Sequence, residues 1–269
     1  MTDFQSQIII AGAGPSGLCA AIELARWGVT STVLERRTLD QPVYPTANHL
    51  TPRSLEIFRS WGLADKIRTA GFPPDYPQTS LFLSSLDQPE LARFSFVQDE
   101  EIERRMTPEP ALWCPRPYLD PVLLEKAQSC PEITLLHGHE ITARHLNDDQ
   151  VSLTAQSKTG EDVTVSGDYL LVAEGANSAT RDQLGIKLIG VTIPIDIDSL
   201  LFHGPELLER LPTPAAQCWF TPPLSATIVA INGKDIWRAH VPKDAMNERA
   251  IEDFLADFCG KVDPLARFP

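Results

Sequence analysis

The glycine-rich segment Gly12–Gly17, with the sequence GAGPSG, constrains this chain more than any other feature. Residues 7–11 before it form a short apolar run, which is typical of a parallel strand buried on both faces. Residues 15–27 carry apolar side chains at helical spacing, and residues 29–35 form a second β-branched run that ends in a glutamate. The order of these pieces predicts a βαβ unit of about thirty residues.

The spacing of this segment, G-x-G-x-x-G at a turn from strand to helix, is what a pyrophosphate site needs. Gly12 allows the tight turn, Gly14 lets backbone N–H groups approach a phosphate, and Gly17 lets the helix pack closely on the strand. The helix N-terminus adds a partial positive charge and unpaired N–H donors. We therefore expect six consecutive residues to bind a dinucleotide: Gly12, Ala13, Gly14, Pro15, Ser16 and Gly17. A glycine turn with a purely structural role is the alternative.

Glu35 closes the second predicted strand, eighteen residues after Gly17. A carboxylate there can accept hydrogen bonds from both ribose hydroxyls of an adenosine, and it would repel a 2′-phosphate. The predicted ligand is therefore FAD or NAD rather than NADP. Arg36 follows directly and is included among the expected cofactor-binding residues, although Arg36 and Arg37 are cations that would weaken the exclusion of a phosphate.

The composition excludes several classes of protein. Lys and Arg number 23 against 36 Asp and Glu, and the net charge of −13 would repel nucleic acid and anionic membrane surfaces alike. The five cysteines are odd in number and form no C-x-x-C pair, so neither a disulfide framework nor a cysteine metal site is expected. Glycines, a proline and Glu23 interrupt the apolar segment 8–25, which argues against a signal peptide or a membrane span. We expect a cytoplasmic protein that binds no metal, nucleic acid or membrane.

The simple alternation of strand and helix stops after the βαβ unit. A helix is predicted over 119–128, with Asp120 as its cap and Pro121 at its first position. Three runs, 133–141, 150–157 and 162–166, read as an antiparallel meander that leads into a fully apolar strand at 169–173. His137 and His139, two residues apart in the first of these runs, are expected to be solvated rather than metal ligands. Short strands are predicted within 79–96 and between 193 and 241.

The chain resembles the class A flavin-dependent monooxygenases, the family of para-hydroxybenzoate and phenol hydroxylases, in three segments: GAGPSGLCAAIELARWGVTSTVLER, TPRSLEIFRSWGL and YLLVAEGANSATRDQLGI. The resemblance covers residues 7 to about 190 by motif and the whole chain more loosely. It implies an α/β fold: a Rossmann-like FAD-binding domain, with a parallel sheet and an antiparallel meander, plus a β-rich substrate domain. The expected FAD-binding segments are 1–78 and 97–190, and the expected substrate-binding segments are 79–96 and 191–269.

The third segment resembles the second cofactor fingerprint of that family, an Asp-Gly followed by Ala-x-Ser-x-x-Arg. The matching residues are Glu174, Gly175, Ala176, Ser178 and Arg181. The resemblance assigns cofactor binding to Glu174 and Gly175, although Glu174 is one methylene longer than the usual aspartate. It also assigns cofactor binding to Arg116, where the family usually has a Gln beside the flavin. Thr46 stands where the family usually has Arg or Lys.

The resemblance further implies the chemistry, in which NAD(P)H reduces FAD and O2 then hydroxylates an electron-rich aromatic or enolic substrate. An aromatic or polyketide-like molecule from secondary metabolism is the expected substrate, and no residue is assigned as the catalytic acid or base. Trp219, Phe220, Trp237 and His240 are candidates for lining the substrate site, with an ordinary core role as the alternative.

The third fingerprint of the family, a Gly-Asp segment that holds the flavin from the other side, is absent from this sequence. Three explanations stay open: a fragment, half of a split enzyme completed by a companion chain or a second copy, and a shortened relative without redox chemistry. The alternative functions are therefore a non-redox enzyme or binding protein on the same scaffold, and an NAD-dependent dehydrogenase. The predicted meander argues against the dehydrogenase because an NAD fold would repeat βα units.

Overall fold

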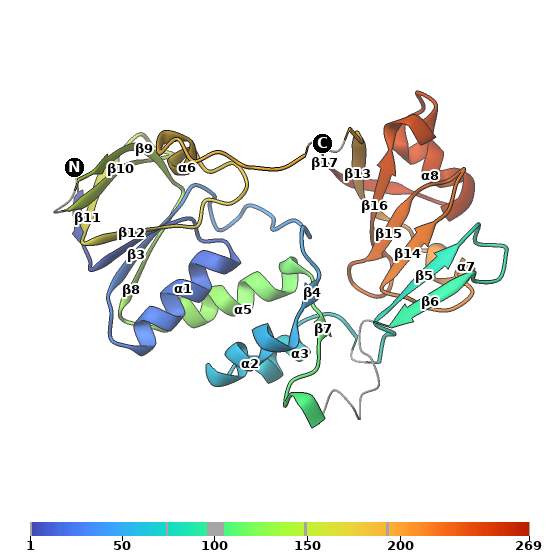
Figure 1. Cartoon of the computed structure of the whole chain (residues 1–269), viewed down its shortest axis with the longest axis horizontal. Helices are drawn as coiled ribbons and strands as arrows, with labels where there is room; N and C mark the ends of the chain where they lie inside the picture. Colours follow the sequence, from blue (N-terminus) through green and yellow to red (C-terminus); the bar gives the residue numbers. More distant parts are fainter. Residues whose placement is uncertain (1, 74, 96–104, 148–149, 192–193, 269) are drawn as a thin grey trace. The chain divides into compact units, whose positions relative to one another are not determined.

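The computed structural model describes residues 2–73, 75–95, 105–147, 150–191 and 194–268. The chain forms two compact units (Figure 1). Unit 1 comprises residues 1–43 and 119–191, and unit 2 comprises residues 44–118 and 192–269. Among the described helices, none is both long enough and apolar enough to cross a membrane.

The central element of unit 1 is a four-stranded parallel sheet in the order β12-β2-β3-β8. Its strands are β12 (Tyr169–Val172), β2 (Ile8–Ala11), β3 (Ser31–Glu35) and β8 (Ile133–His137). Helix α1 (Pro15–Arg26) joins β2 to β3, which confirms the predicted βαβ unit. Its buried residues recur at helical spacing: Leu18, Ala21, Ile22 and Ala25.

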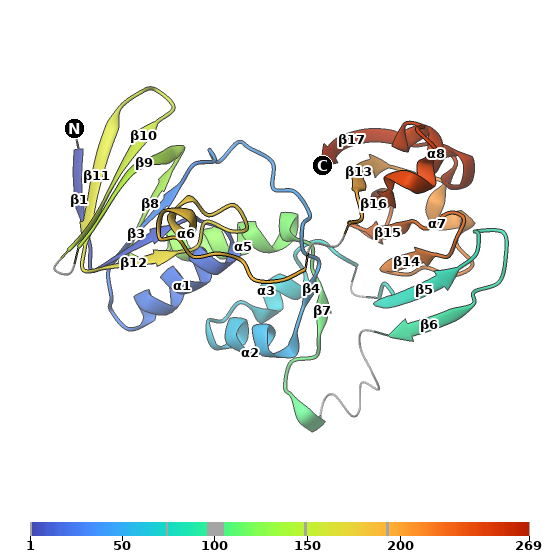
Figure 2. The ribbon, with the colours of Figure 1, turned by 45° about the horizontal axis from the view of Figure 1, so that its top comes forward.

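Both faces of this sheet are covered, which explains why every residue of the central strand β3 is buried, as are Ile9, Ile10 and Ala11 of β2. Helix α1 packs against β2, β3 and β8, with α5 (Arg116–Gln128) beside it (Figure 1). The opposite face packs on a second sheet in the order β1-β11-β10-β9 (Figure 2). Its strands are β1 (Thr2–Gln5), β9 (His139–Leu146), β10 (Val151–Ser157) and β11 (Asp162–Gly167). Ile9 and Leu34 of the parallel sheet share a core with Leu153 and Val165 of this meander.

The single predicted strand at 133–141 is wrong, because two strands in different sheets occupy it. Gly138 has a φ of +71°, a left-handed conformation that favours glycine, and it separates β8 from β9. His137 and His139 therefore lie in different strands. The prediction that both are solvated is wrong for His137, whose Nε2 is buried without a hydrogen-bond partner in the described structure.

The fully apolar strand predicted at 169–173 is present as β12, but it is not buried on both sides. Among the described strands, β12 pairs with β2 alone and lies at the edge of the sheet. Tyr169 is 69% exposed and Val172 is 40% exposed. Apolar character indicates a strand here, but burial depends on a neighbour that the sequence pattern does not reveal.

The predicted helix at 119–128 begins three residues earlier than expected. Helix α5 runs from Arg116 to Gln128 and contains Pro121 in its interior. Because Pro121 has no N–H, the Pro117 carbonyl lacks its usual helical donor. Asp120, the expected cap, is instead a buried helical residue.

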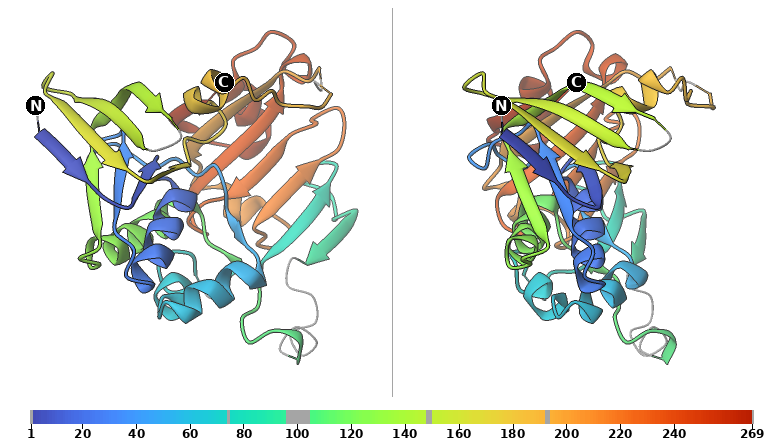
Figure 3. Two further views of the ribbon diagram at one scale, coloured as in Figure 1. Left: turned by 60° about the vertical axis from the view of Figure 1, so that its left-hand side comes forward. Right: turned by 90° about the vertical axis from the view of Figure 1, so that its left-hand side faces the viewer.

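Unit 2 is built on a seven-stranded sheet in the order β17-β13-β16-β15-β14-β5-β6. Figure 3 shows its orange and red strands continuing into the teal hairpin of β5 and β6. The strands are β17 (Asp263–Phe268), β13 (Ile197–His203), β16 (Ile236–Pro242), β15 (Thr227–Ala230), β14 (Gln217–Phe220), β5 (Thr79–Leu83) and β6 (Ala92–Ser95). Helices α7 (Leu207–Arg210) and α8 (Ile251–Cys259) contribute Leu207, Phe254 and Leu255 to the core on one face of this sheet.

Unit 2 also contains α2 (Pro52–Ser60), α3 (Ala64–Arg68), η1 (Lys243–Met246) and a two-stranded ribbon of β4 (His49–Leu50) and β7 (Leu112–Trp113). The compact units therefore differ from the expected segments, since residues 44–78 and 105–118 cluster with the β-rich sheet. The expected boundary at 96/97 lies outside the described residues. The assignment of cofactor and substrate roles to the two units stays a prediction.

Candidate cofactor-binding site

The glycine loop of unit 1 follows β2 directly, and its backbone leaves no room for side chains at two positions. Gly12 has a φ of +105°, and a Cβ there would meet the Ala173 carbonyl oxygen at 2.4 Å. A Cβ on Gly17 would meet the Gly12 carbonyl oxygen at 1.9 Å. These contacts are the tight turn and the close helix packing expected of the first and third glycines.

Gly14 is different, because an added Cβ would meet nothing within 4 Å. It is the N-cap of α1, with extended backbone angles and no capping side chain. Gly14, Ser16 and Gly17 have no hydrogen-bond acceptor for their N–H groups in the part of the chain that the structure describes. The open space beside Gly14 therefore faces unpaired amides at the positive end of a twelve-residue helix.

Glu35 lies at the carboxyl end of β3, next to this loop, with its side chain 9% exposed. Its Oε2 accepts a hydrogen bond from the Ala13 N–H at 2.9 Å, and its Oε1 accepts from the Arg37 N–H at 2.9 Å and from Arg37 Nε at 3.2 Å. Burial acts to raise the pKa of Glu35, but these hydrogen bonds outweigh it and lower the pKa. Glu35 is therefore held ionised with about one acceptor position free, since a carboxylate has about four.

Arg36 and Arg37 differ in their surroundings. Arg37 bonds Glu35, whereas Arg36 is exposed. The role of Arg36 in cofactor binding stays a prediction.

Glu174 follows β12 and braces the turn that leads into α6 (Ala179–Gln183). Its Oε1 accepts from the Arg144 guanidinium at 2.7 Å, and its Oε2 accepts from the Ser178 hydroxyl at 2.7 Å and the Thr180 N–H at 2.9 Å. Burial acts to raise the pKa of Glu174, but the hydrogen bonds from Arg144, Ser178 and Thr180 outweigh it and hold the pKa at about 2. Gly175, with a φ of +83°, provides the left-handed turn residue.

The sequence analysis missed Arg144, which lies on β9 of the meander. Its guanidinium bonds both Glu174 and the Thr180 hydroxyl, and its side chain is only 11% exposed. No sequence signal marks it, because it lies thirty residues before Glu174 and carries no motif. Three of the four acceptor positions of Glu174 are thus used within the protein, which favours positioning of the turn as its role.

Arg116 and Thr46 belong to unit 2 and contact each other. Arg116 donates from a terminal guanidinium nitrogen to the Thr46 hydroxyl at 3.0 Å, and its backbone N–H donates to the Ala47 carbonyl at 3.1 Å. Thr46, which stands where the family usually has Arg or Lys, is therefore contacted by the guanidinium of Arg116 from a distant segment of the chain. Cofactor binding by Arg116 stays a prediction.

The four candidates for a substrate site separate into two pairs. Phe220 and Trp237 are 5% and 1% exposed and belong to the core, so the ordinary core role holds for them. Trp219 is 43% exposed, and His240 is partly buried beside Ser199. Alternation along β14 and β16 places the two pairs on opposite faces of the sheet.

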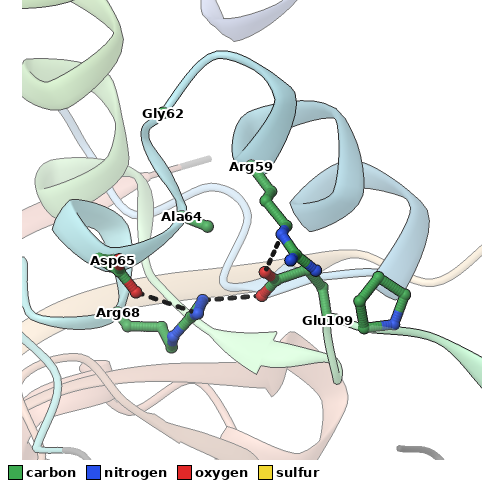
Figure 4. Close-up of a pocket in the computed structure, with 7 residues that line it drawn as sticks. Arg59, Gly62, Ala64, Asp65, Arg68 and Glu109 are labelled. Carbon is green, nitrogen blue, oxygen red and sulfur yellow. Dashed lines mark hydrogen bonds and ion pairs between the residues drawn. The ribbon is translucent and has the colours of Figure 1, made fainter. Parts of the chain in front are cut away.

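A shallow polar pocket of about 340 Å³ lies among Arg59, Gly62, Ala64, Asp65, Arg68, Pro108 and Glu109 (Figure 4). The buried Glu109 carboxylate lies between the two guanidinium groups, 2.7 Å from Arg68 and 3.6 Å from Arg59. Arg68 also pairs with Asp65. The two cations are thus already neutralised, which favours a structural link between α2, α3 and the residue 105–110 segment.

The family model for the FAD binding domain matches residues 5–257 of this chain. The chain belongs to the FAD binding domain family. Membership confirms the resemblance drawn from the glycine loop and the Glu174 segment, and it confirms the expected fold.

Relatives of this FAD binding domain include the FAD-dependent monooxygenase apdD of Emericella nidulans, 33% identical over 206 residues. This alignment covers 73% of the chain and 32% of the relative. Aklavinone 12-hydroxylase DnrF of Streptomyces peucetius subsp. caesius is 28% identical over 273 residues, which are 96% of the chain and 54% of the relative. The chain thus spans about a third to a half of these relatives.

Solved structures of flavin enzymes are also similar to this chain, and it again spans about half of their length. The flavin-dependent monooxygenase PieE, in complex with FAD and substrate, superposes with a TM-score of 0.86 at 27% identity, covering 100% of this chain and 50% of PieE. The rebeccamycin biosynthetic enzyme RebC, with reduced flavin, superposes with a TM-score of 0.87 at 26% identity, covering 100% of this chain and 52% of RebC.

The residues around the glycine loop fit the ADP part of FAD. The open space at Gly14 and the free amides of α1 match an anionic diphosphate, and the ionised Glu35 retains an acceptor for a ribose hydroxyl.

Proposed function

We propose that this chain is the FAD-binding part of a monooxygenase that uses NAD(P)H and O2 to hydroxylate an aromatic or enolic small molecule. The observation that carries the proposal is the cradle at Gly14, where open space faces unpaired amides next to an ionised Glu35. The names of the relatives, which include a 2,4-dichlorophenol monooxygenase and an aklavinone hydroxylase, support the choice of reaction.

The residues of this chain bind and orient the cofactor. The amides of Gly14, Ser16 and Gly17 would hold the diphosphate, and Glu35 would accept a hydrogen bond from the ribose. Glu174, fixed by Arg144, would set the shape of the second cofactor turn. FAD supplies the redox chemistry when bound, and the protein supplies position and exclusion of water.

The expected substrate is an aromatic, polyketide-like molecule of secondary metabolism, and the expected location is the cytoplasm. In this proposal, the region that the relatives have beyond the matched part comes from the same polypeptide, from a companion chain or from a second copy. The hydrogen bond from Arg116 to Thr46 supports Arg116 as the cation that replaces the Arg or Lys usual at the position of Thr46.

The test is calorimetric titration of the purified protein with FAD. Glu35→Ala should weaken FAD binding by about tenfold to a hundredfold, since it removes a charged hydrogen-bond acceptor. Glu23→Ala is the matched control, because Glu23 is a glutamate on the exposed side of α1 that pairs with Arg26, and it should leave FAD affinity unchanged.

Titration of the wild-type protein that shows no binding of FAD would overturn the proposal. A non-redox function on this scaffold predicts substrate turnover that persists after FAD and NAD(P)H are removed. Substrate-stimulated oxidation of NAD(P)H, dependent on FAD, is the result expected here.

A further inference from the structure

The second face of the seven-stranded sheet carries a guanidinium, that of Arg238, with no carboxylate partner among the described residues. Along β16, Trp237, Ala239 and Val241 are buried in the core, whereas Arg238 and His240 alternate with them and lie on the opposite face. Within the residues that the structure describes, no Asp or Glu lies within ion-pair distance of Arg238. Its guanidinium instead contacts a backbone carbonyl and an aromatic ring.

Arg238 is held in place but is poorly satisfied. One terminal guanidinium nitrogen donates to the Pro45 carbonyl at 2.5 Å, and the guanidinium carbon lies 4.8 Å from the centre of the Phe268 ring. Its Nε is buried and has no acceptor in the described structure. A guanidinium has five N–H donors, and the terminal N–H groups of Arg238 that do not bond Pro45 have no acceptor in the described structure. A half-buried, unpaired charge is costly, and a bound anion would remove that cost.

His240, two residues further along β16, is a neutral polar neighbour of Arg238. The Nδ1 atom of His240 and the Ser199 hydroxyl share a hydrogen bond of 2.8 Å. Ser199 lies directly opposite His240, on the neighbouring strand β13. Burial, together with the nearby Arg238 charge, lowers the pKa of His240 to about 4. His240 is therefore uncharged at neutral pH, and an anion beside Arg238 would meet no competing carboxylate and one further ring nitrogen.

An aromatic surface lies on the same face of the sheet. Strand pairing places Ser199, His240, Thr227, Trp219 and Phe82 in one cross-strand row. The exposed rings of Trp219 and Phe82 are nearly parallel, with 13° between their planes and 6.4 Å between their centres. Trp219 is two strands away from β16, which corresponds to roughly 10 Å. The face thus combines a cation at one end with an apolar ring surface at the other.

We propose that Arg238 is a substrate-recognition residue, which binds an oxyanion of an extended aromatic substrate through its free guanidinium donors. The oxyanion is a carboxylate or an ionised phenol, and the ring system lies toward Trp219 and Phe82. This inference rests on the proposed function, because it names the substrate class of that reaction. It assigns no proton transfer to Arg238.

The test is binding of matched anionic and neutral probes at pH 7, measured by calorimetry with and without FAD. The carboxylate pair is 2-naphthoate and 2-naphthamide, and the phenolate pair is 2,4-dinitro-1-naphthol, ionised at this pH, and its methyl ether. We expect the anion of at least one pair to bind about tenfold or more tightly than its neutral partner. The pair that shows this preference identifies the oxyanion.

Arg238→Gln should abolish the preference while changing the affinity for the neutral probe by less than about twofold. Arg238→Lys, which keeps the charge but loses the planar fork, should retain part of the preference. Arg249→Gln removes the same charge from an exposed ion pair with Asp257 and should change neither affinity. Circular dichroism checks that each variant is folded, and Arg238→Lys serves if Arg238→Gln does not fold.

Three results would overturn the inference: no preference for the anion in wild-type protein, no binding of any probe, or an Arg238→Gln variant that weakens both members of a pair equally. The last outcome would show that Arg238 only positions Pro45. Because these titrations need no turnover, failure of FAD to bind would count against the proposed function and leave the anion preference measurable.

Discussion

Single residues decide whether the glycine loop can act as a cradle, and the three glycines contribute in different ways. Gly12 and Gly17 are needed because backbone atoms occupy the space of a side chain. Gly14 is needed only if a ligand occupies the space beside it, since the protein leaves that space open. Substitutions at Gly17 and at Gly14 can therefore separate an effect on stability from an effect on ligand binding.

Gly17→Ala should lower the free energy of unfolding by more than about 2 kcal/mol, because its Cβ would overlap the Gly12 carbonyl. Gly14→Ala should change the free energy of unfolding by less than about 1 kcal/mol, since its φ of −69° suits alanine. The same change should weaken FAD binding about tenfold or more, because the methyl group enters the ligand space. Urea unfolding and FAD titration measure the two effects. Unchanged FAD affinity in Gly14→Ala would place the diphosphate elsewhere.

At the scale of elements, a partly buried carboxylate joins elements that are distant in sequence. Glu174 after β12, Arg144 on β9 and Thr180 on α6 form one hydrogen-bonded group. An aspartate, one methylene shorter, would have to pull these elements together to make the same contacts. The extra methylene of glutamate at position 174 thus allows the carboxylate to contact Arg144.

Glu174→Gln should lower the free energy of unfolding by about 2–4 kcal/mol, because Arg144 loses its anionic partner in a largely buried position. Asp182→Asn is the control, since Asp182 is 68% exposed and its ion pair with Arg181 should be worth less than about 1 kcal/mol. Urea unfolding at pH 7 compares the two. Equal effects of both substitutions would contradict a bracing role for Glu174.

At the scale of the whole molecule, the two units can be followed by separate signals. Trp61, Trp113, Trp219 and Trp237 belong to unit 2, whereas Trp27 in unit 1 is 78% exposed. Tryptophan fluorescence therefore reports mainly on the folding of unit 2. Under the proposed function, FAD binding reports on the glycine loop of unit 1.

The tryptophan-detected urea midpoint should fall as the pH drops from 6.5 toward 4. Burial, with the nearby Arg238 charge, lowers the pKa of His240 from 6.5 to about 4 in the folded chain, so protonation favours the unfolded chain. The contribution of His240 is complete above pH 6.5 and is lost as the pH approaches 4. His240→Gln should flatten this dependence, whereas His145→Gln, at an exposed position in unit 1, should not. An identical pH dependence in His240→Gln would exclude His240 as its source.

The sequence by itself determined the βαβ unit, the glycine turn and the position of Glu35. These follow from local rules: periodicity, the conformational freedom of glycine and the end of a strand. The resemblance to the monooxygenases pointed to the turn at Glu174 and Gly175, where the structure has Ser178 capping α6 and Gly175 in a left-handed conformation; cofactor binding there stays a prediction.

Only the tertiary structure decided which strands are central and which polar groups are paired. The edge position of β12, the division at Gly138 and the bond from Arg144 to Glu174 all depend on neighbours far away in the chain. The lack of a carboxylate partner for Arg238 among the described residues is of the same kind, because it depends on which carboxylates are near in space. Local patterns fix backbone conformation, whereas burial and pairing of charges are properties of the packed molecule.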